Sequence, residues 1–317
     1  MKKYFCLLLV CLILAGCTPK KEMPSATYLD VFDTVTTVMG GDPESVHSQL
    51  QRYHKLFDIY NTYENFNNLK TVNDNAGIAP VTVDKEIIEL LTDCVDYYNL
   101  TGGKVNVAMG AVLKLWRTAR EESLAHPEKA YIPSPEDLEH AAKHTDIGCM
   151  VIDAENSTVY LTDPEMSLDV GAVAKGWAAQ KVAESAPTGM LISLGGNVVA
   201  TGPKAENTPW SVGIQDPSGS DLRRKLPLTK GAMVTSGDYQ RFYTVAGENY
   251  HHIIDPATGM PGRLWSSVTV VCVDSALADA LSTALFLLPL EEGKALAGKC
   301  GAQVYWIDKN GNEFTTP

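Results

Sequence analysis

Residues 169–178 read DVGAVAKGWA, a run rich in small residues that carries one lysine. Small residues let a backbone approach a neighbouring helix or a ligand closely, and the free N–H groups at the start of a helix attract anions. Lys175 adds a positive charge at that point. We predict a helix over residues 172–186 that begins beside a ligand, although a glycine ahead of a helix more often serves packing alone.

Strands dominate the chain beyond this helix. The Gly195-Gly196 pair is typical of a hairpin turn, and an apolar run predicts a helix over residues 276–288. Runs rich in β-branched and aromatic residues predict strands at 190–194, 197–201, 210–215, 232–235, 240–245, 250–254, 267–273 and 302–307.

Helices dominate the chain before it. Helical spacing of apolar residues predicts helices at 44–60, 84–100 and 111–124, with another that starts at Ser134. Strands or hairpins are expected at 28–39 and across 150–161. Because strands joined by short turns alternate irregularly with helices, we predict an α+β fold with mixed or antiparallel sheets, and a subdomain boundary near residue 147.

The N-terminus predicts export and lipid attachment. A basic start precedes an apolar stretch, residues 4–14, which is too short to span a bilayer comfortably and is typical of a signal peptide. The following LAGC at residues 14–17 resembles a bacterial lipobox, although an ordinary signal peptide with an incidental cysteine is the alternative. We expect a signal peptide over 1–16, a lipidated Cys17 with a tether over 17–27, and one domain over 28–317 on the extracytoplasmic face of a bacterial cell membrane.

Composition limits the class of partner. The formal charge is −12, and removal of Lys2 and Lys3 with the signal peptide takes it to −14. This balance argues against nucleic acid as a partner, and any anionic ligand then needs a local positive element or a metal. The cysteines outside the leader are widely spaced and form no CxxC pair, so they indicate buried thiols rather than a zinc site.

Three polar motifs in the second half of the chain could carry chemistry. VTSGDYQR at 234–241 is either a turn or a ligand-binding corner, and YHHIIDPATG at 250–259 carries a histidine suited to proton transfer. In ADALSTA, residues 278–284, Asp279 and Thr283 lie one turn apart on one helix face. A carboxylate and a hydroxyl suit magnesium, whereas backbone donors that satisfy Asp279 are the alternative.

Taken together and in this order, these motifs resemble the ApbE family of FAD:protein FMN transferases. The resemblance covers about the whole chain after the leader and is strongest over residues 169–286. Earlier segments at 32–34, 60–62 and 104–116 are similar but looser. Asn106 and Ala257 depart from an aspartate and an arginine that are frequent in the family.

The resemblance implies an ApbE-like fold of two closely packed subdomains and an enzyme that uses Mg²⁺ to move FMN from FAD to a Thr or Ser hydroxyl of a target protein, with release of AMP. The targets would be flavin-acceptor proteins of membrane or extracellular electron-transfer systems. His252 would act as general base and Asp279 would also be catalytic. The magnesium ligands would be Asp279, Thr283 and the backbone carbonyl of Ala172. The residues that would contact FAD are Tyr60, Lys104, Val105, Asn106, Asp169, Lys175 and Ile254.

Two other functions remain open from the sequence. An FAD pyrophosphatase would use water as nucleophile and release FMN and AMP to solution. A non-enzymatic lipoprotein that stores or presents flavin would carry similar binding motifs.

Overall fold

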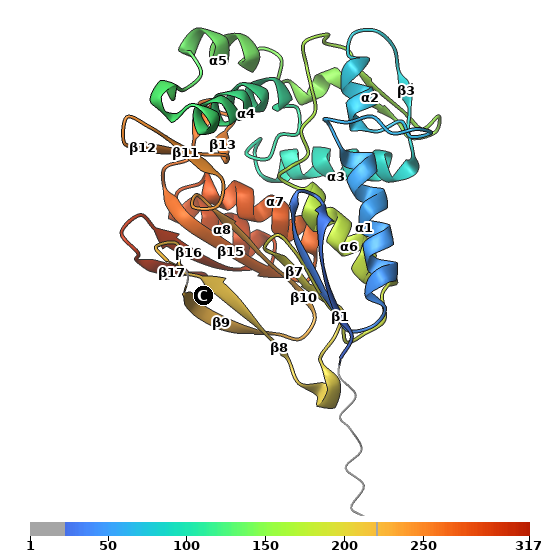
Figure 1. Cartoon of the computed structure of the whole chain (residues 1–317), viewed down its shortest axis with the longest axis vertical. Coiled ribbons are helices and arrows are strands. Elements are labelled where there is room, and N and C mark those ends of the chain that lie inside the picture. Colours follow the sequence, from blue (N-terminus) through green and yellow to red (C-terminus); the bar gives the residue numbers. More distant parts are fainter. Residues whose placement is uncertain (1–22, 220) are drawn as a thin grey trace, which may run out of the picture.

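A computed structural model of the chain describes residues 23–219 and 221–317 (Figure 1). The predicted signal peptide and Cys17 lie outside these residues. The fold combines antiparallel sheets with helices, so the predicted α+β class is confirmed. Within the part of the chain that the structure describes, no helix has the length and hydropathy needed to cross a bilayer.

A sheet of eight strands forms the base of the molecule (Figure 1). All its neighbouring strands pair antiparallel. In sheet order the strands are β1 (Ser25–Val31), β2 (Thr34–Met39), β6 (Leu191–Leu194), β7 (Asn197–Ala200), β10 (Gly231–Gly237), β15 (Trp265–Cys272), β16 (Gln303–Asp308) and β17 (Glu313–Thr315).

Both faces of this sheet are covered, and the alternation of side chains along its strands decides what each face contacts. Val199 and Val234 pack with helices α6 (Ala174–Ser185) and α7 (Ser275–Phe286). Their sequence neighbours Val198 and Met233 point the other way, toward the hairpin of β8 (Trp210–Gln215) and β9 (Leu222–Leu228). In Figure 1 this hairpin lies in front of the sheet and the two helices lie behind it.

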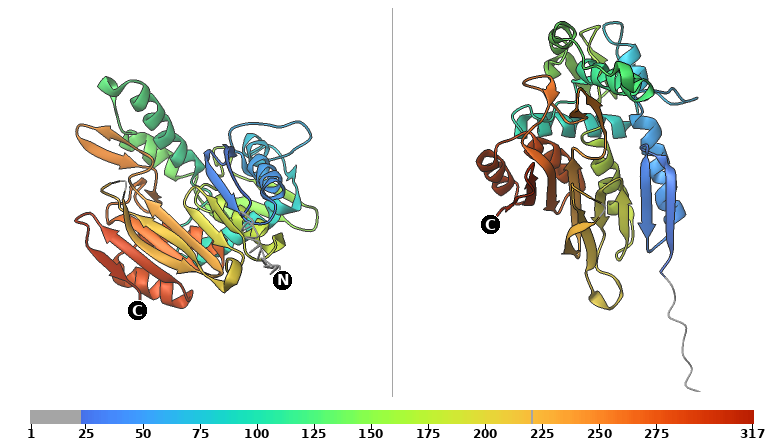
Figure 2. Two further views of the ribbon diagram at one scale, coloured as in Figure 1. Left: turned by 60° about the horizontal axis from the view of Figure 1, so that its bottom comes forward. Right: turned by 60° about the vertical axis from the view of Figure 1, so that its left-hand side comes forward.

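A mostly helical layer lies above one end of the sheet (Figures 1 and 2). Its helices include α4 (Gly110–Ala125), which packs against α5 (Pro135–Ala142) and β11 (Phe242–Val245).

The other helices of the described chain, besides α6 and α7, are α1 (Pro43–Phe57), α2 (Leu69–Asp74), α3 (Lys85–Leu100) and α8 (Leu290–Lys299). Turns of 3₁₀ helix occur at Pro127–Lys129, Ile147–Cys149 and Ala205–Asn207. The small sheets pair β3 (Val81–Thr82) and β4 (Met150–Asp153) with β5 (Thr158–Leu161), β11 (Phe242–Val245) with β12 (Glu248–His251), and β13 (Ile254–Asp255) with β14 (Met260–Pro261).

Strand pairing links the two halves of the sequence. The N-terminal strand β2 pairs with β6, and β3 pairs with β5, so hydrogen-bonded partners lie on both sides of residue 147, near which we predicted a subdomain boundary. The N-terminal hairpin therefore belongs to the main sheet.

Most predicted elements are found, with local corrections. The helix expected from residue 172 begins at Ala174. The strand expected over 250–254 ends at His251, because the His251 ring accepts a hydrogen bond from the Ile253 amide and the chain bends there. Helices α2 and α8 and strands β3, β9, β13, β14 and β17 are additional to the prediction.

Helices α6 and α7 meet at Gly176. A Cβ atom at this position would lie 2.4 Å from the Asp279 Cβ and 2.4 Å from the Ser275 carbonyl oxygen. The missing side chain lets the Gly176 amide donate a hydrogen bond of 2.8 Å to the Asp279 carboxylate. The small residues of the motif at 169–178 thus serve close helix packing, and that packing also fixes an acidic group.

We predict that Gly176→Ala lowers the free energy of unfolding by about 1–3 kcal/mol, because the added methyl group must push the two helices apart. Gly298→Ala is the matched control: it also lies in a helix, α8, and an added Cβ would meet nothing within 4 Å. The control should stabilise the chain by up to about 1 kcal/mol. Denaturant unfolding curves measure both, and an unchanged midpoint for Gly176→Ala would contradict the packing argument.

Candidate active site

One cavity of about 490 Å³ lies between the end of the large sheet and the helical layer. Every predicted site residue within the described part of the chain lines it. These residues are Tyr60, Lys104, Val105, Asn106, Asp169, Ala172, Lys175, His252, Ile254, Asp279 and Thr283. They come from segments separated by as much as two hundred residues, and the fold brings them to one place. The predicted lipidation site Cys17 lies outside the described residues.

Asp279 provides the buried negative charge of the cavity. Its side chain is buried, and burial raises the pKa of this carboxyl group, although Lys175, the Gly176 amide and the Asn197 side chain oppose the shift. The Lys175 ammonium lies 4.0 Å from an Asp279 oxygen. Burial outweighs these three groups, so the carboxylate is only partly compensated, which is an unfavourable state for a buried charge.

This under-compensated carboxylate fits a divalent cation. Thr283 is one helical turn from Asp279 on α7 and lines the same cavity, as does Ala172, two residues ahead of α6. A carboxylate, a hydroxyl and a carbonyl are hard oxygen ligands of the kind that Mg²⁺ prefers. The backbone donor that we considered as an alternative partner for Asp279 is present, since Gly176 occupies one carboxylate oxygen.

Positive side chains line the cavity, and sequence reasoning missed two of them, Arg117 and Arg120. Arg117, Arg120 and Arg241 line it together with Lys175. The Arg241 guanidinium also donates to the Asp33 carbonyl oxygen at 3.4 Å. Arg117 and Arg120 are three residues apart on a predicted helix, and this spacing was the available signal that both face one side. The acidic chain therefore has a local positive element at the cavity.

Tyr60 is held at the mouth of the cavity with its ring half exposed. The Asp58 carboxylate accepts a hydrogen bond of 2.6 Å from the Tyr60 amide, which fixes the turn after α1. The Arg117 guanidinium lies 4.5 Å from the centre of the Tyr60 ring, a cation–π distance. The pair presents an aromatic face and a cation to the same space.

The segment at 104–106 lines the cavity, but two of its side chains have protein partners. The Lys104 ammonium pairs with the Asp255 carboxylate at 2.9 Å. The Asn106 amide donates to the Thr145 carbonyl oxygen at 2.9 Å, and its oxygen accepts from the Ala108 amide at 2.9 Å. Asn106 thus fixes the backbone of the cavity wall.

Asp169 lies at the same wall. Burial raises the pKa of its carboxyl group, while the Gly171 amide and the nearby Arg117 and Lys175 act in the opposite direction. The Gly171 amide donates to the Asp169 carboxylate at 2.9 Å, so the loop ahead of α6 folds around this residue.

Both neighbouring histidines, His251 and His252, line the cavity. His251 is buried; one ring nitrogen lies 2.6 Å from the Gly262 carbonyl oxygen and the other accepts from Ile253. His252 is exposed toward the cavity. Desolvation by the surrounding protein is the main cause that lowers its pKa to about 3, and the positive charge of Arg241 is the second. Its imidazole is therefore neutral near pH 7, and its Nδ1 lies 3.3 Å from the Arg241 carbonyl oxygen.

The sequence profile of the ApbE family matches residues 27–306. The chain belongs to the ApbE family. It is 37% identical over 248 residues to the FAD:protein FMN transferase of Treponema pallidum (strain Nichols), covering 72% of this chain and 67% of that protein. It is 28% identical over 285 residues to the FAD:protein FMN transferase of Haemophilus influenzae, covering 86% of this chain and 81% of that protein.

Solved structures of ApbE proteins share the fold. The crystal structure of the ApbE protein of Thermotoga maritima MSB8 aligns with a TM-score of 0.83 at 28% identity, over 93% of this chain and 97% of that chain. The flavin transferase ApbE of Vibrio cholerae aligns with a TM-score of 0.75 at 23% identity, over the same shares of the two chains. The predicted family and its fold are confirmed.

We predict that Asp279→Asn stabilises this ApbE-family chain in the absence of divalent cations, by about 1–3 kcal/mol near neutral pH. The amide side chain keeps an oxygen for Gly176 and removes a buried charge. Because burial raises the folded-state pKa of Asp279, the wild type binds this proton more tightly when folded. Its stability relative to the variant therefore falls as the pH rises from the ordinary aspartate range.

Urea midpoints for both proteins at about pH 5 and about pH 8, in chelator, measure this effect. The gap should widen at the higher pH. A variant that is less stable than the wild type at both pH values would show that the carboxylate is fully compensated in the fold.

Proposed function

We propose that this ApbE-family chain is an FAD:protein FMN transferase that uses Mg²⁺, attaches FMN through its phosphate to a Thr or Ser hydroxyl of a target protein, and releases AMP. The observation that carries the proposal is the convergence of all eleven described site residues on one cavity. The names of the relatives, FAD:protein FMN transferases with up to 37% identity, support the same substrate.

The charges of the cavity suit a diphosphate. Lys175, Arg117 and Arg241 can neutralise phosphate oxygens, while the aromatic face of Tyr60 offers a stacking surface for a ring. Mg²⁺ held by Asp279, Thr283 and the Ala172 carbonyl would supply further positive charge to the diphosphate, which phosphoryl transfer needs more than covalent help. If a ring of FAD stacks on Tyr60 at the mouth of the cavity, the diphosphate would lie deeper, near Lys175 and Asp279.

His252 would take the proton of the acceptor. The hydroxyl oxygen of the target forms a bond to the phosphorus of the FMN half, and the bond from that phosphorus to the bridging oxygen breaks. The hydroxyl proton passes to the neutral imidazole of His252, and the bridging oxygen leaves with AMP. General base catalysis of this kind contributes about 10²–10⁴-fold.

A transfer assay tests the function and separates it from the two alternatives. The purified chain is incubated with FAD, Mg²⁺ and a competent acceptor protein, and intact mass and AMP are measured. Transfer gives an acceptor mass gain of one FMN unit with matching AMP. AMP release that does not depend on the acceptor would identify a pyrophosphatase, and FAD that stays intact would identify a binding protein.

We predict that His252→Ala slows FMN transfer by about 10²–10⁴-fold and leaves FAD binding within about threefold of wild type, because the neutral ring accepts a proton and carries no charge for phosphate. His126→Ala is the control, since His126 is exposed and does not line the cavity. Single-turnover kinetics and FAD titration measure the two effects. Transfer at the wild-type rate would remove His252 as the base.

We also propose that Cys17 anchors the chain to the extracytoplasmic face of the cell membrane, where its acceptors would be flavin-carrying proteins of electron-transfer systems. The support is the lipobox-like LAGC and the basic, apolar leader ahead of it. Cys17→Ser should abolish labelling by a palmitate analogue and shift the chain from the membrane fraction to the soluble fraction. A variant that stays labelled at wild-type level would exclude Cys17 as the modified residue.

A further inference from the structure

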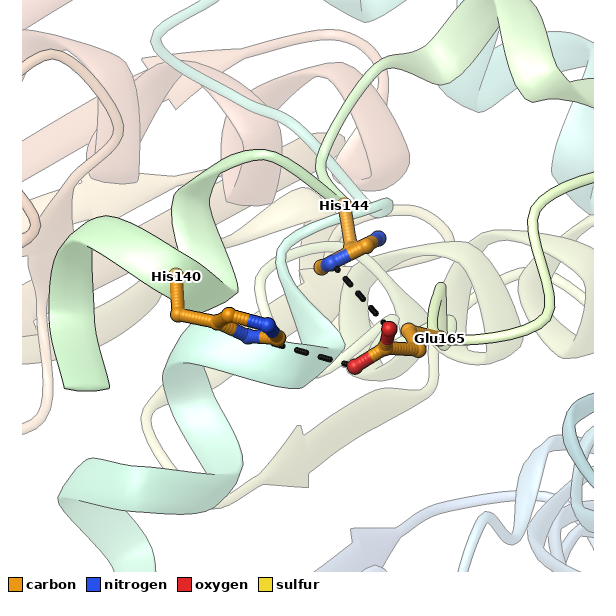
Figure 3. A group of neighbouring side chains, drawn as sticks. All are labelled: His140, His144 and Glu165. Carbon is orange, nitrogen blue, oxygen red and sulfur yellow. Dashed lines mark ion pairs between the residues drawn. The ribbon is translucent and has the colours of Figure 1, made fainter.

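A second group of potential metal ligands lies outside the cavity (Figure 3). His140 belongs to α5, His144 follows the end of that helix, and Glu165 lies in the segment between β5 and α6. The sequence places Glu165 more than twenty residues after the histidines, so spacing alone gave no metal motif. None of the three residues lines the cavity.

The three side chains converge on one point. One ligand atom from each lies within 4.8 Å of the other two. The His144 Nε2 is 3.7 Å from one Glu165 oxygen, and the His140 Nδ1 is 3.9 Å from the other. These separations are too long for hydrogen bonds. Tetrahedral Zn²⁺ with bonds of about 2.0–2.2 Å needs neighbouring ligand atoms about 3.4 Å apart, so the side chains must move together by up to about 1.4 Å from the present separations within 4.8 Å.

This adjustment falls on exposed side chains. The side chains of His140 and Glu165 are 62% and 58% exposed, so rotation costs them little packing. His144 is mostly buried, at 17% exposure, and provides the fixed side of the cluster.

An acidic neighbour orients His144 in the manner of a metal-bound histidine. The Asp163 carboxylate lies 2.8 Å from the His144 Nδ1, and a carboxylate accepts, so this nitrogen carries the proton. The Nε2 lone pair is then directed toward Glu165. Asp163 is itself fixed, because its carboxylate accepts from the Glu165 amide at 2.9 Å. Carboxylate–histidine–metal arrangements of this kind set ring orientation and raise ligand basicity.

In this tautomer an imidazole lone pair faces a carboxylate with no proton between them. Two acceptors in that position favour a shared cation, which is either a second proton on His144 or a metal ion. Among metal ions, two imidazoles and one carboxylate suit Zn²⁺ and related transition metals and do not suit Mg²⁺.

We propose that His140, His144 and Glu165 bind one Zn²⁺ or similar transition-metal ion, with Asp163 as the orienting partner and the fourth position open to solvent. The ion would join the end of α5 to the segment that leads into the cavity wall. Glu165 is four residues before Asp169, and Thr145, next to His144, accepts the hydrogen bond from Asn106. The site is independent of the proposed flavin chemistry.

Calorimetric titration of the tag-free, metal-free chain with Zn²⁺ tests the proposal. We expect one site of micromolar or tighter affinity that excess Mg²⁺ does not displace. His140→Gln, His144→Gln and Glu165→Gln should each weaken binding by at least about tenfold, and Asp163→Asn by about tenfold or more. His126→Gln, which removes a similarly exposed histidine with a nearby carboxylate, should bind as wild type.

Two further measurements keep the outcome clear. Asp279→Asn should leave this Zn²⁺ affinity unchanged, which separates the site from the cavity. Thermal unfolding should show a Zn²⁺-dependent rise in melting temperature for wild type that is absent in His144→Gln, and circular dichroism of each variant checks its fold. Absence of a Zn²⁺ site, equal affinity in all variants, or loss of binding only in Asp279→Asn would overturn the proposal.

Discussion

The close approach of α6 and α7 at Gly176 is the constraint on which the site depends. The absent side chain lets a backbone amide reach a carboxylate that is buried among apolar residues of α7. Lys175 in the first turn of α6 and Ala172 just ahead of it thereby line the same cavity as Asp279 and Thr283. The large sheet packs against both helices from one side. The contact between Gly176 and Asp279 therefore serves both the packing of the helices and the placement of the carboxylate. This explains why small residues and an aspartate occur together here.

Elements with a strong local pattern were predictable, and those without one were not. Apolar spacing predicted α1, α3 and α4, because each buries a stripe of side chains, and a continuous apolar run predicted α7, which is buried on nearly all sides. The α8 sequence LEEGKALAGK contains two glycines and buries little, so its stripe is weak. The β9 sequence LRRKLPL carries charges and a proline because the strand is mostly exposed and belongs to a two-stranded sheet with β8.

Site residues that are close in the sequence could be predicted to lie together, whereas the meeting of residues from distant segments could not. Asp279 and Thr283 could be placed together from the helical repeat alone, but nothing local related them to Tyr60 or Arg117, which reach the cavity through long-range packing. For the same reason we did not predict that His251 would use both ring nitrogens to fix the bend that leaves His252 open.

The direction of β1 has a geometric consequence for access. The strand begins with Ser25 at the end of the molecule remote from the cavity and leads to Asp33 at the cavity itself (Figure 1). Its seven residues extend over about 20 Å at the rise of a β-strand. If Cys17 anchors the chain as proposed, the length of β1 would separate the cavity from the end of the domain that the tether enters. The distance from the membrane at which an acceptor presents its hydroxyl would then influence which acceptors the anchored chain can modify.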